Sequence, residues 1–183
     1  MSHTKIAVYD FDGTLFRSPE KPVGWDGGWW GNTASLSPPV VPQDPGAEWW
    51  NGSVVQRAKQ DISDPETLTV LLTGRLQKKF TLRVRELLTQ AGLKFDHVFL
   101  APGGDTESYK LKVLTQLVKD NPTARGVDIW EDRANHLAKF SDHVESMGRA
   151  AYPHLITVAA HEPGEETERK ASPKAVSDRY LRG

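Results

Sequence analysis

The sequence contains no cysteine among its 183 residues, and this absence excludes several kinds of chemistry together. A disulfide scaffold, a thiolate metal site and a cysteine nucleophile cannot be built. No apolar run approaches the ~20 residues that a membrane-spanning helix needs. The opening residues, MSHTKIAVYD, reach an acid too early for a secretory signal peptide. We therefore expect a soluble, cytoplasmic protein that does not associate with membranes.

An excess of either charge is also absent, because 23 lysines and arginines oppose 24 aspartates and glutamates. This balance argues against a broad basic field for binding nucleic-acid backbones, although it leaves room for a local basic groove. The length fits one compact domain with a modest insertion. We expect that domain to span residues 1–160, and we expect the polar, charged residues 161–183 to form a flexible tail.

Tryptophan is abundant in one segment only. Residues 19–52 hold six of the twelve prolines and five of the six tryptophans, namely Trp25, Trp29, Trp30, Trp49 and Trp50. A segment with little regular structure needs large aromatic side chains to pack onto the main domain. The same side chains could instead form a platform on which bases or another flat substrate stack. We expect most of the five to be structural and the remainder to face a substrate.

Outside this segment, short apolar strands alternate with amphipathic helices. The pattern predicts strands at residues 5–11, 68–73, 95–100, 127–130 and 155–159. Apolar residues at helical spacing predict helices around residues 53–61, 80–91, 111–118 and 137–147. This alternation predicts a three-layer, Rossmann-like α/β fold with a parallel sheet. Residues 16–67, which separate the first two strands, are expected to form a small, irregular, cap-like insertion.

Polar residues follow the predicted strands at the edge where parallel sheets bind ligands. Those after the first, second and fourth strands are Asp10, Asp12, Gly13 and Thr14, then Thr73, Gly74 and Arg75, then Glu131, Asp132 and Arg133. Lys110 and Lys112 lie at the start of the helix that follows the third strand. We therefore expect four carboxylates, a hydroxyl and a lysine to converge on one edge of the sheet.

The chemistry of this set points to phosphoryl transfer. Carboxylates gathered together raise one another's pKa unless a cation neutralises them. Oxygen ligands without histidine or cysteine suit Mg²⁺, and a hydroxyl, a lysine and backbone amides suit a phosphate. A further carboxylate can attack phosphorus to form an aspartyl-phosphate, which water then hydrolyses.

The same residues resemble the four motifs of the haloacid dehalogenase-like (HAD) phosphohydrolase superfamily, in the same order. The matching segments are DFDGTL after the first strand, LLTGR, the lysine that opens a later helix, and IWED. The resemblance implies a phosphatase in which Asp10 is the nucleophile and Asp12 the general acid and base. It also implies that Thr73 and Lys110 bind the phosphoryl group. Mg²⁺ would be held by Asp10, the backbone carbonyl of Asp12, Asp132 and Glu131.

A narrower resemblance is to the HAD domain described in "Swiss Army knife" RNA-repair proteins. It rests on the segments YDFDGTLFRSP, WWN, LLTGR, SYK and EDRANH. That family pairs an aromatic residue with its lysine, which favours Lys110, next to Tyr109, over Lys112. The implied substrate is a phosphorylated RNA end or nucleotide. A separate RNA ligase or kinase is an expected partner, because the motif GxxxxGK[ST] does not occur in the chain.

Several alternatives remain open from the sequence. Gly13, Thr14 and Gly74 are expected to contact the substrate. Thr73 could cap a helix instead of binding the phosphoryl group. The side chains of Arg75 and Arg133 could bind substrate phosphates or pair with the neighbouring acids. The protein could be a small-metabolite phosphatase, or an inert HAD scaffold that binds RNA or protein.

Overall fold

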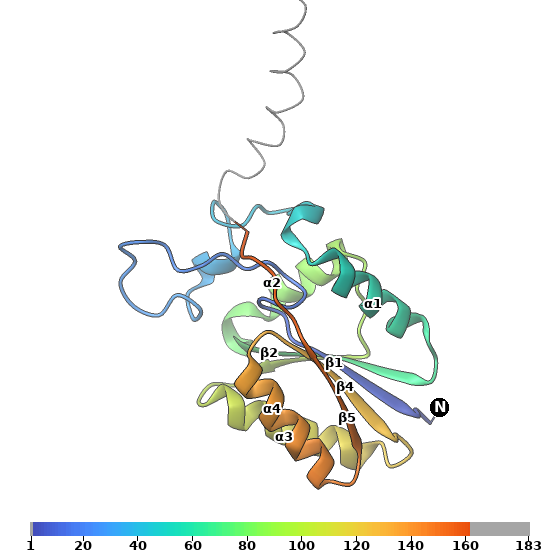
Figure 1. The fold of residues 1–183 in the computed structure, drawn as a ribbon. Helices are drawn as coiled ribbons and strands as arrows, with labels where there is room; N and C mark the ends of the chain where they lie inside the picture. The colour runs from blue at the N-terminus through green and yellow to red at the C-terminus, as the bar shows by residue number, and fades with distance from the viewer. Residues whose placement is uncertain (1, 162–183) are drawn as a thin grey trace, which may run out of the picture.

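A computed structural model of the chain describes residues 2–161, in which five parallel strands form one sheet with helices on both faces (Figure 1). The strands are β1 (Lys5–Tyr9), β2 (Thr67–Leu76), β3 (His97–Ala101), β4 (Gly126–Glu131) and β5 (Ala150–Leu155), in the spatial order β3-β2-β1-β4-β5. The helices are α1 (Gly52–Ser63), α2 (Gln77–Gln90), α3 (Thr106–Asp120) and α4 (Ala134–Ser146). The predicted three-layer α/β fold is confirmed.

The central strand β1 separates the two halves of the core because its side chains alternate between the faces of the sheet. Ile6 and Val8 pack in the cluster that includes residues of α3 and α4. Ala7 and Tyr9 pack in the other cluster, which includes residues of α1 and α2. In Figure 1 these two pairs of helices lie on opposite sides of the sheet. A parallel sheet covered in this way brings the carboxyl ends of β1, β2 and β4 to one edge.

The edge strand β5 differs from its prediction. A strand over residues 155–159 is wrong, because β5 spans Ala150–Leu155 and pairs with β4 from Gly126 to Glu131. An edge strand is only partly covered, so its residues need not form an apolar run, and Pro153 is tolerated there. Ile156, from the apolar run, packs instead against the α1–α2 side of the core.

The insertion is irregular, as predicted, with two short 3₁₀ helices at Thr33–Leu36 and Ala47–Trp49 before α1. Its end is fastened by aromatic packing: the Phe16 ring lies 5.2 Å from the Phe11 ring and 5.0 Å from the Trp50 ring, between centroids. His161, the first residue of the predicted tail, is buried 3.8 Å from the Trp49 ring. The rest of that tail, residues 162–183, lies outside the described residues.

Within residues 2–161, no helix is long and apolar enough to cross a bilayer.

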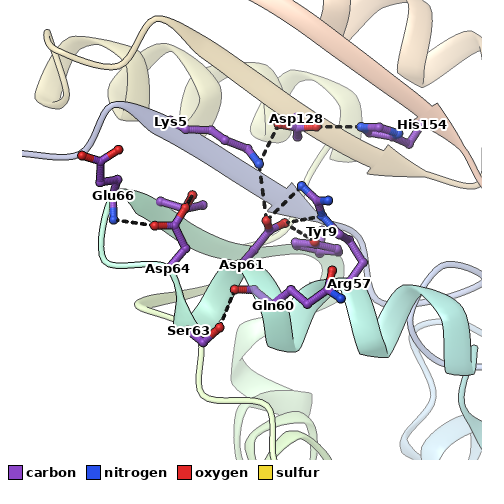
Figure 2. A network of polar contacts seen from close by, with 11 residues as sticks. Lys5, Tyr9, Arg57, Gln60, Asp61, Ser63, Asp64, Glu66, Asp128 and His154 are labelled. Carbon is purple, nitrogen blue, oxygen red and sulfur yellow. Dashed lines mark hydrogen bonds and ion pairs between the residues drawn. The ribbon is translucent and has the colours of Figure 1, made fainter.

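A buried polar network joins α1 to the central strand β1 (Figure 2). The Tyr9 hydroxyl donates a hydrogen bond of 2.5 Å to Asp61, a buried carboxylate near the end of α1. Lys5 and Arg57 place nitrogen atoms 3.3 Å and 3.2 Å from the same carboxylate. Because Asp61 is out of water, these three partners replace its hydration.

We expect Asp61→Ala to lower the free energy of unfolding by about 2–3 kcal/mol, since it leaves the buried Tyr9 hydroxyl without its acceptor. Tyr9→Phe removes only the hydroxyl and should cost about 1 kcal/mol. Urea denaturation at pH 7 measures both values, with the exposed Asp142→Ala on α4 as control. Equal stabilities of the Asp61 and Asp142 variants would contradict the assigned role of the network.

Candidate functional site

A cavity of about 360 Å³ lies where the carboxyl ends of β1, β2 and β4 meet. It is lined by Asp10, Asp12, Trp30, Gly74, Arg75, Thr106, Asp132 and Arg133. Six of these eight residues were predicted for the site from the sequence. Gly13 and Thr14 are not among the described residues that line the cavity, although both belong to the loop between Asp12 and Leu15.

A buried triad occupies the floor of the site. Lys110 on α3 places its Nζ atom 3.0 Å from Asp10 Oδ1 and 2.8 Å from Glu131 Oε2. All three side chains are almost fully buried, whereas Lys112 is exposed on the same helix. Of the two lysines considered from the sequence, Lys110 is therefore the one that contacts the predicted nucleophile.

Burial is the largest influence on the pKa of Asp10 in this triad. It raises the pKa of Asp10 to about 7, with Lys110 opposing the shift and the charges of Glu131 and Asp12 adding to it. Burial alone would lower the pKa of Lys110, but the charges of Asp10 and Glu131 outweigh it and raise that pKa. The lysine is thus held as a cation between two carboxylates.

Three carboxylates are close enough to share one cation. Oxygen atoms of Asp10, Glu131 and Asp132 lie within 4.8 Å of one another. Burial raises the pKa of Asp132, and the charge of Asp10 adds to the shift. Gly13 makes room for this arrangement: its φ is +68°, and a Cβ atom there would lie 2.5 Å from Asp132 Oδ2. An all-oxygen set with surplus negative charge fits Mg²⁺.

The partner of Arg75 is Asp12. Arg75 Nη2 lies 2.7 Å from Asp12 Oδ1, and Nε lies 2.9 Å from Oδ2, so the guanidinium grips the carboxylate with two groups. The Ser18 hydroxyl donates a further hydrogen bond of 2.5 Å. Burial alone would raise the pKa of Asp12, but the charge and hydrogen bonds of Arg75 lower it. Of the two alternatives for Arg75, the structure contains the ion pair with a neighbouring acid.

Arg75 also connects the site to the insertion. Its Nη1 donates a 3.1 Å hydrogen bond to the carbonyl oxygen of Trp30 and another bond to the Ser35 hydroxyl. Arg133, by contrast, is half exposed at the cavity wall, with its Nε 3.7 Å from Glu131 Oε1. One arginine therefore holds the site together, and the other keeps a charged group in the cavity.

Thr73 is fully buried at the end of β2, and its Oγ1 accepts a 3.2 Å hydrogen bond from the backbone N–H of Arg75. A helix-cap role is excluded, because α2 begins at Gln77 with Leu76 as its cap residue. Gly74 permits close packing against α3, since a Cβ atom there would lie 2.6 Å from Thr106 Cγ2.

Two cavity residues were not singled out for the site from the sequence. Thr106 begins α3 directly after its cap residue, Asp105, whose carboxylate accepts a 2.8 Å hydrogen bond from Ser108 N. The only sequence feature that pointed to Thr106 was its position directly after a glycine-containing turn. Trp30 was one of five equivalent tryptophans, and no local pattern distinguished it from Trp29.

Carboxylates at the carboxyl edge of a parallel sheet, with a buried lysine from a later helix between two of them, define an α/β domain of the HAD type. The chain belongs to HAD domain family 1 in Swiss Army Knife RNA repair proteins, whose family model matches residues 18–172. The match begins after the loop that holds Asp10 and Asp12.

One curated relative matches most of the chain. An uncharacterized protein of Saccharomyces cerevisiae, YMR265C, is 25% identical over 173 residues, a match that covers 79% of this chain and 38% of the yeast protein. The chain thus spans well under half the length of that curated relative.

Solved structures show the same fold at low sequence identity. A chain of the Pnkp1/Rnl/Hen1 RNA repair complex matches with a TM-score of 0.55 and 15% identity, covering 85% of this chain and 43% of that one. The HAD domain of the effector protein Lem4 from Legionella pneumophila matches with a TM-score of 0.56 and 14% identity, covering 93% and 95%.

The raised pKa of Asp10 predicts a pH-dependent cost to stability in metal-free protein. Between pH 4 and about 7 an unfolded Asp10 ionises while the folded one stays protonated, so the cost grows with pH and then levels off. Asp10→Asn removes it, and we expect the melting temperature of the variant to exceed that of the wild type by at least about 3 °C at pH 8.

Thermal melts in EDTA from pH 4 to 8 measure this difference, which should shrink toward pH 4. A difference that is constant across the range would contradict the assignment. Added Mg²⁺ should raise the melting temperature of the wild type at pH 8, because binding to the folded state stabilises it.

Proposed function

We propose that the chain is a Mg²⁺-dependent phosphatase that hydrolyses phosphomonoesters through an aspartyl-phosphate. The observation that carries the proposal is the buried Asp10 carboxylate, 3.0 Å from Lys110 and facing a cavity that it shares with Asp12 and Asp132. A nucleophile and a proton-transfer group thereby line one cavity, and a buried cation contacts the nucleophile.

In the first step an Asp10 oxygen attacks phosphorus, the bond from phosphorus to the ester oxygen breaks, and Asp12 donates a proton to that oxygen. In the second step water attacks the phosphorus of the aspartyl-phosphate, Asp12 takes a proton from the water, and phosphate leaves Asp10. Thr73 and Lys110 bind the transferring phosphoryl group throughout.

Asp12 is ionised against Arg75, which suits the second step. For the first step it must carry a proton, and a phosphate oxygen in the cavity offers Arg75 a second acceptor that weakens its hold on Asp12. Asp10, Glu131, Asp132 and the backbone carbonyl of Asp12 would hold Mg²⁺. When bound, this ion neutralises carboxylate and phosphate charge and keeps Asp10 ionised.

The substrate that we infer is a phosphorylated RNA end or nucleotide, processed in the cytoplasm alongside a separate RNA ligase or kinase. Membership of a family described in RNA repair proteins supports this, as does the likeness of fold to a chain of an RNA repair complex. Gly74, Arg75 and Arg133 line the cavity where such a phosphate would lie.

A panel of phosphorylated compounds tests the activity: RNA and DNA oligomers with 5′-, 3′- or 2′-phosphates, nucleotides, and an aryl phosphate, each with Mg²⁺ or EDTA. We expect release of phosphate with Mg²⁺ only, and a loss of at least about 10³-fold in Asp10→Asn. Turnover that survives Asp10→Asn would refute the nucleophile. Aryl phosphate turnover with no preference for nucleic acid would favour a small-metabolite phosphatase, and tight oligomer binding without turnover would favour an inert scaffold.

A matched pair of variants tests the lysine. We expect Lys110→Met to reduce kcat/KM by about 10²–10³-fold, because it removes a cation beside the transferring phosphoryl group. Lys112→Met, two residues away on the exposed side of α3, should leave the rate within twofold. Steady-state phosphate release compares them at equal folded fraction, checked by circular dichroism. Equal rates for the two variants would remove Lys110 from the mechanism.

A further inference from the structure

Trp30 differs from the other tryptophans of its segment. Among the described residues 2–161, Trp29, Trp49 and Trp50 are 2%, 3% and 9% exposed, whereas Trp30 is 46% exposed. Trp25 packs against Trp29, with ring centroids 5.0 Å apart, and does not line the cavity. Packing within the protein therefore explains the positions of the buried tryptophan rings, and Trp30 has no comparable packing role.

The exposed ring is nevertheless held in a defined place. The carbonyl oxygen of Trp30 accepts a hydrogen bond from Arg75 at the end of β2, and that of Gly31 accepts one of 2.8 Å from Lys79 on α2. Both donors belong to the main domain, so two successive carbonyl groups that follow the Cα atom of Trp30 are fastened to the end of β2 and to α2. A ring on a fixed backbone is preorganised for binding.

The side chains of Phe80 and Arg75 support the ring of Trp30. The guanidinium carbon of Arg75 lies 4.9 Å from the centre of the Phe80 ring and 5.1 Å from the centre of the Trp30 ring. Attraction between the cation and the two π-systems adds to the hydrogen bonds of Arg75. The order Phe80, Arg75, Trp30 runs from the core outward and ends at an indole in the same cavity as Asp10.

We propose that Trp30 is a specificity-determining residue, on which the nucleobase of a nucleoside phosphate stacks while its phosphate lies at Asp10. This inference rests on the proposed phosphatase activity, and it names the part of the substrate that the cavity selects. A volume of about 360 Å³ is of the size that a single small ligand occupies. Indole stacking recognises the face of a base and not its hydrogen-bonding edge, so it selects for a base without choosing among bases.

The test compares substrates with and without a base. Nucleoside monophosphates and phosphorylated oligonucleotides carry the base, and ribose 5-phosphate carries the same sugar and phosphate without it. We expect Trp30→Leu, which keeps an apolar side chain over Arg75 but removes the π-face, to raise KM for the base-bearing substrates about 5- to 100-fold. Its KM for ribose 5-phosphate should change less than twofold.

Two further variants serve as controls. Trp30→Phe should recover part of the lost affinity, because it restores a smaller aromatic face. Trp25→Leu, in the same segment but outside the cavity, should leave both classes of substrate unchanged. Equal losses for ribose 5-phosphate and nucleotides in Trp30→Leu would overturn the proposal and assign the ring a structural role, and so would no loss at all.

A binding measurement separates this inference from the proposed activity. Calorimetry of Asp10→Asn with nucleoside monophosphate, with and without Trp30→Leu in addition, reports stacking whether or not the wild type turns over. Binding that depends on Trp30 in a protein without phosphatase activity would refute the activity and support the stacking. If only the binding of oligonucleotides depends on Trp30, the base belongs to a nucleic-acid end. If the binding of mononucleotides depends on Trp30 as well, a free nucleotide is a source of the base.

Discussion

The site depends on how four carboxylates are kept close together at one edge of the sheet. Lys110 and Arg75 are the buried cations that oppose them: Lys110 lies between Asp10 and Glu131, and Arg75 grips Asp12. Burial raises the pKa of Asp10 and Asp132, and the charges of neighbouring carboxylates add to the shift. A divalent cation would relieve this repulsion, so the surplus of charge that is expected to destabilise the metal-free protein also fits the proposed Mg²⁺ site.

Arg75 has a second role, because its N–H groups donate hydrogen bonds to two different parts of the chain. It binds Asp12 in the loop after β1, and it binds Trp30 and Ser35 in the insertion. The order of the insertion is therefore coupled to the position of the group proposed to transfer protons. This irregular segment is held by side chains of the main domain, among them Arg75 at the end of β2 and Lys79 on α2.

Much of this arrangement could be predicted. The strands β1, β2 and β4 are buried on both faces and therefore have sequences of continuous apolar character, which made them recognisable. The helices α2, α3 and α4 have a buried stripe at helical spacing. The edge strand β5 did not fit this rule, because it is only partly covered and includes Pro153, and the apolar run after it serves the core through Ile156. For the lysine, the aromatic neighbour Tyr109 pointed to Lys110, which is the buried one.

By itself, the sequence determined which chemistry was available and where along the chain it lay. Carboxylates follow the first and fourth predicted strands, a threonine ends the second, a lysine opens a later helix, and cysteine is absent. These features are local, since each depends on strand periodicity and the residues next to it. Only the tertiary structure decided that Arg75 pairs with Asp12, 63 residues away, and that Trp30 is open to the cavity while Trp29 is buried. Such choices depend on distances between segments that periodicity does not encode.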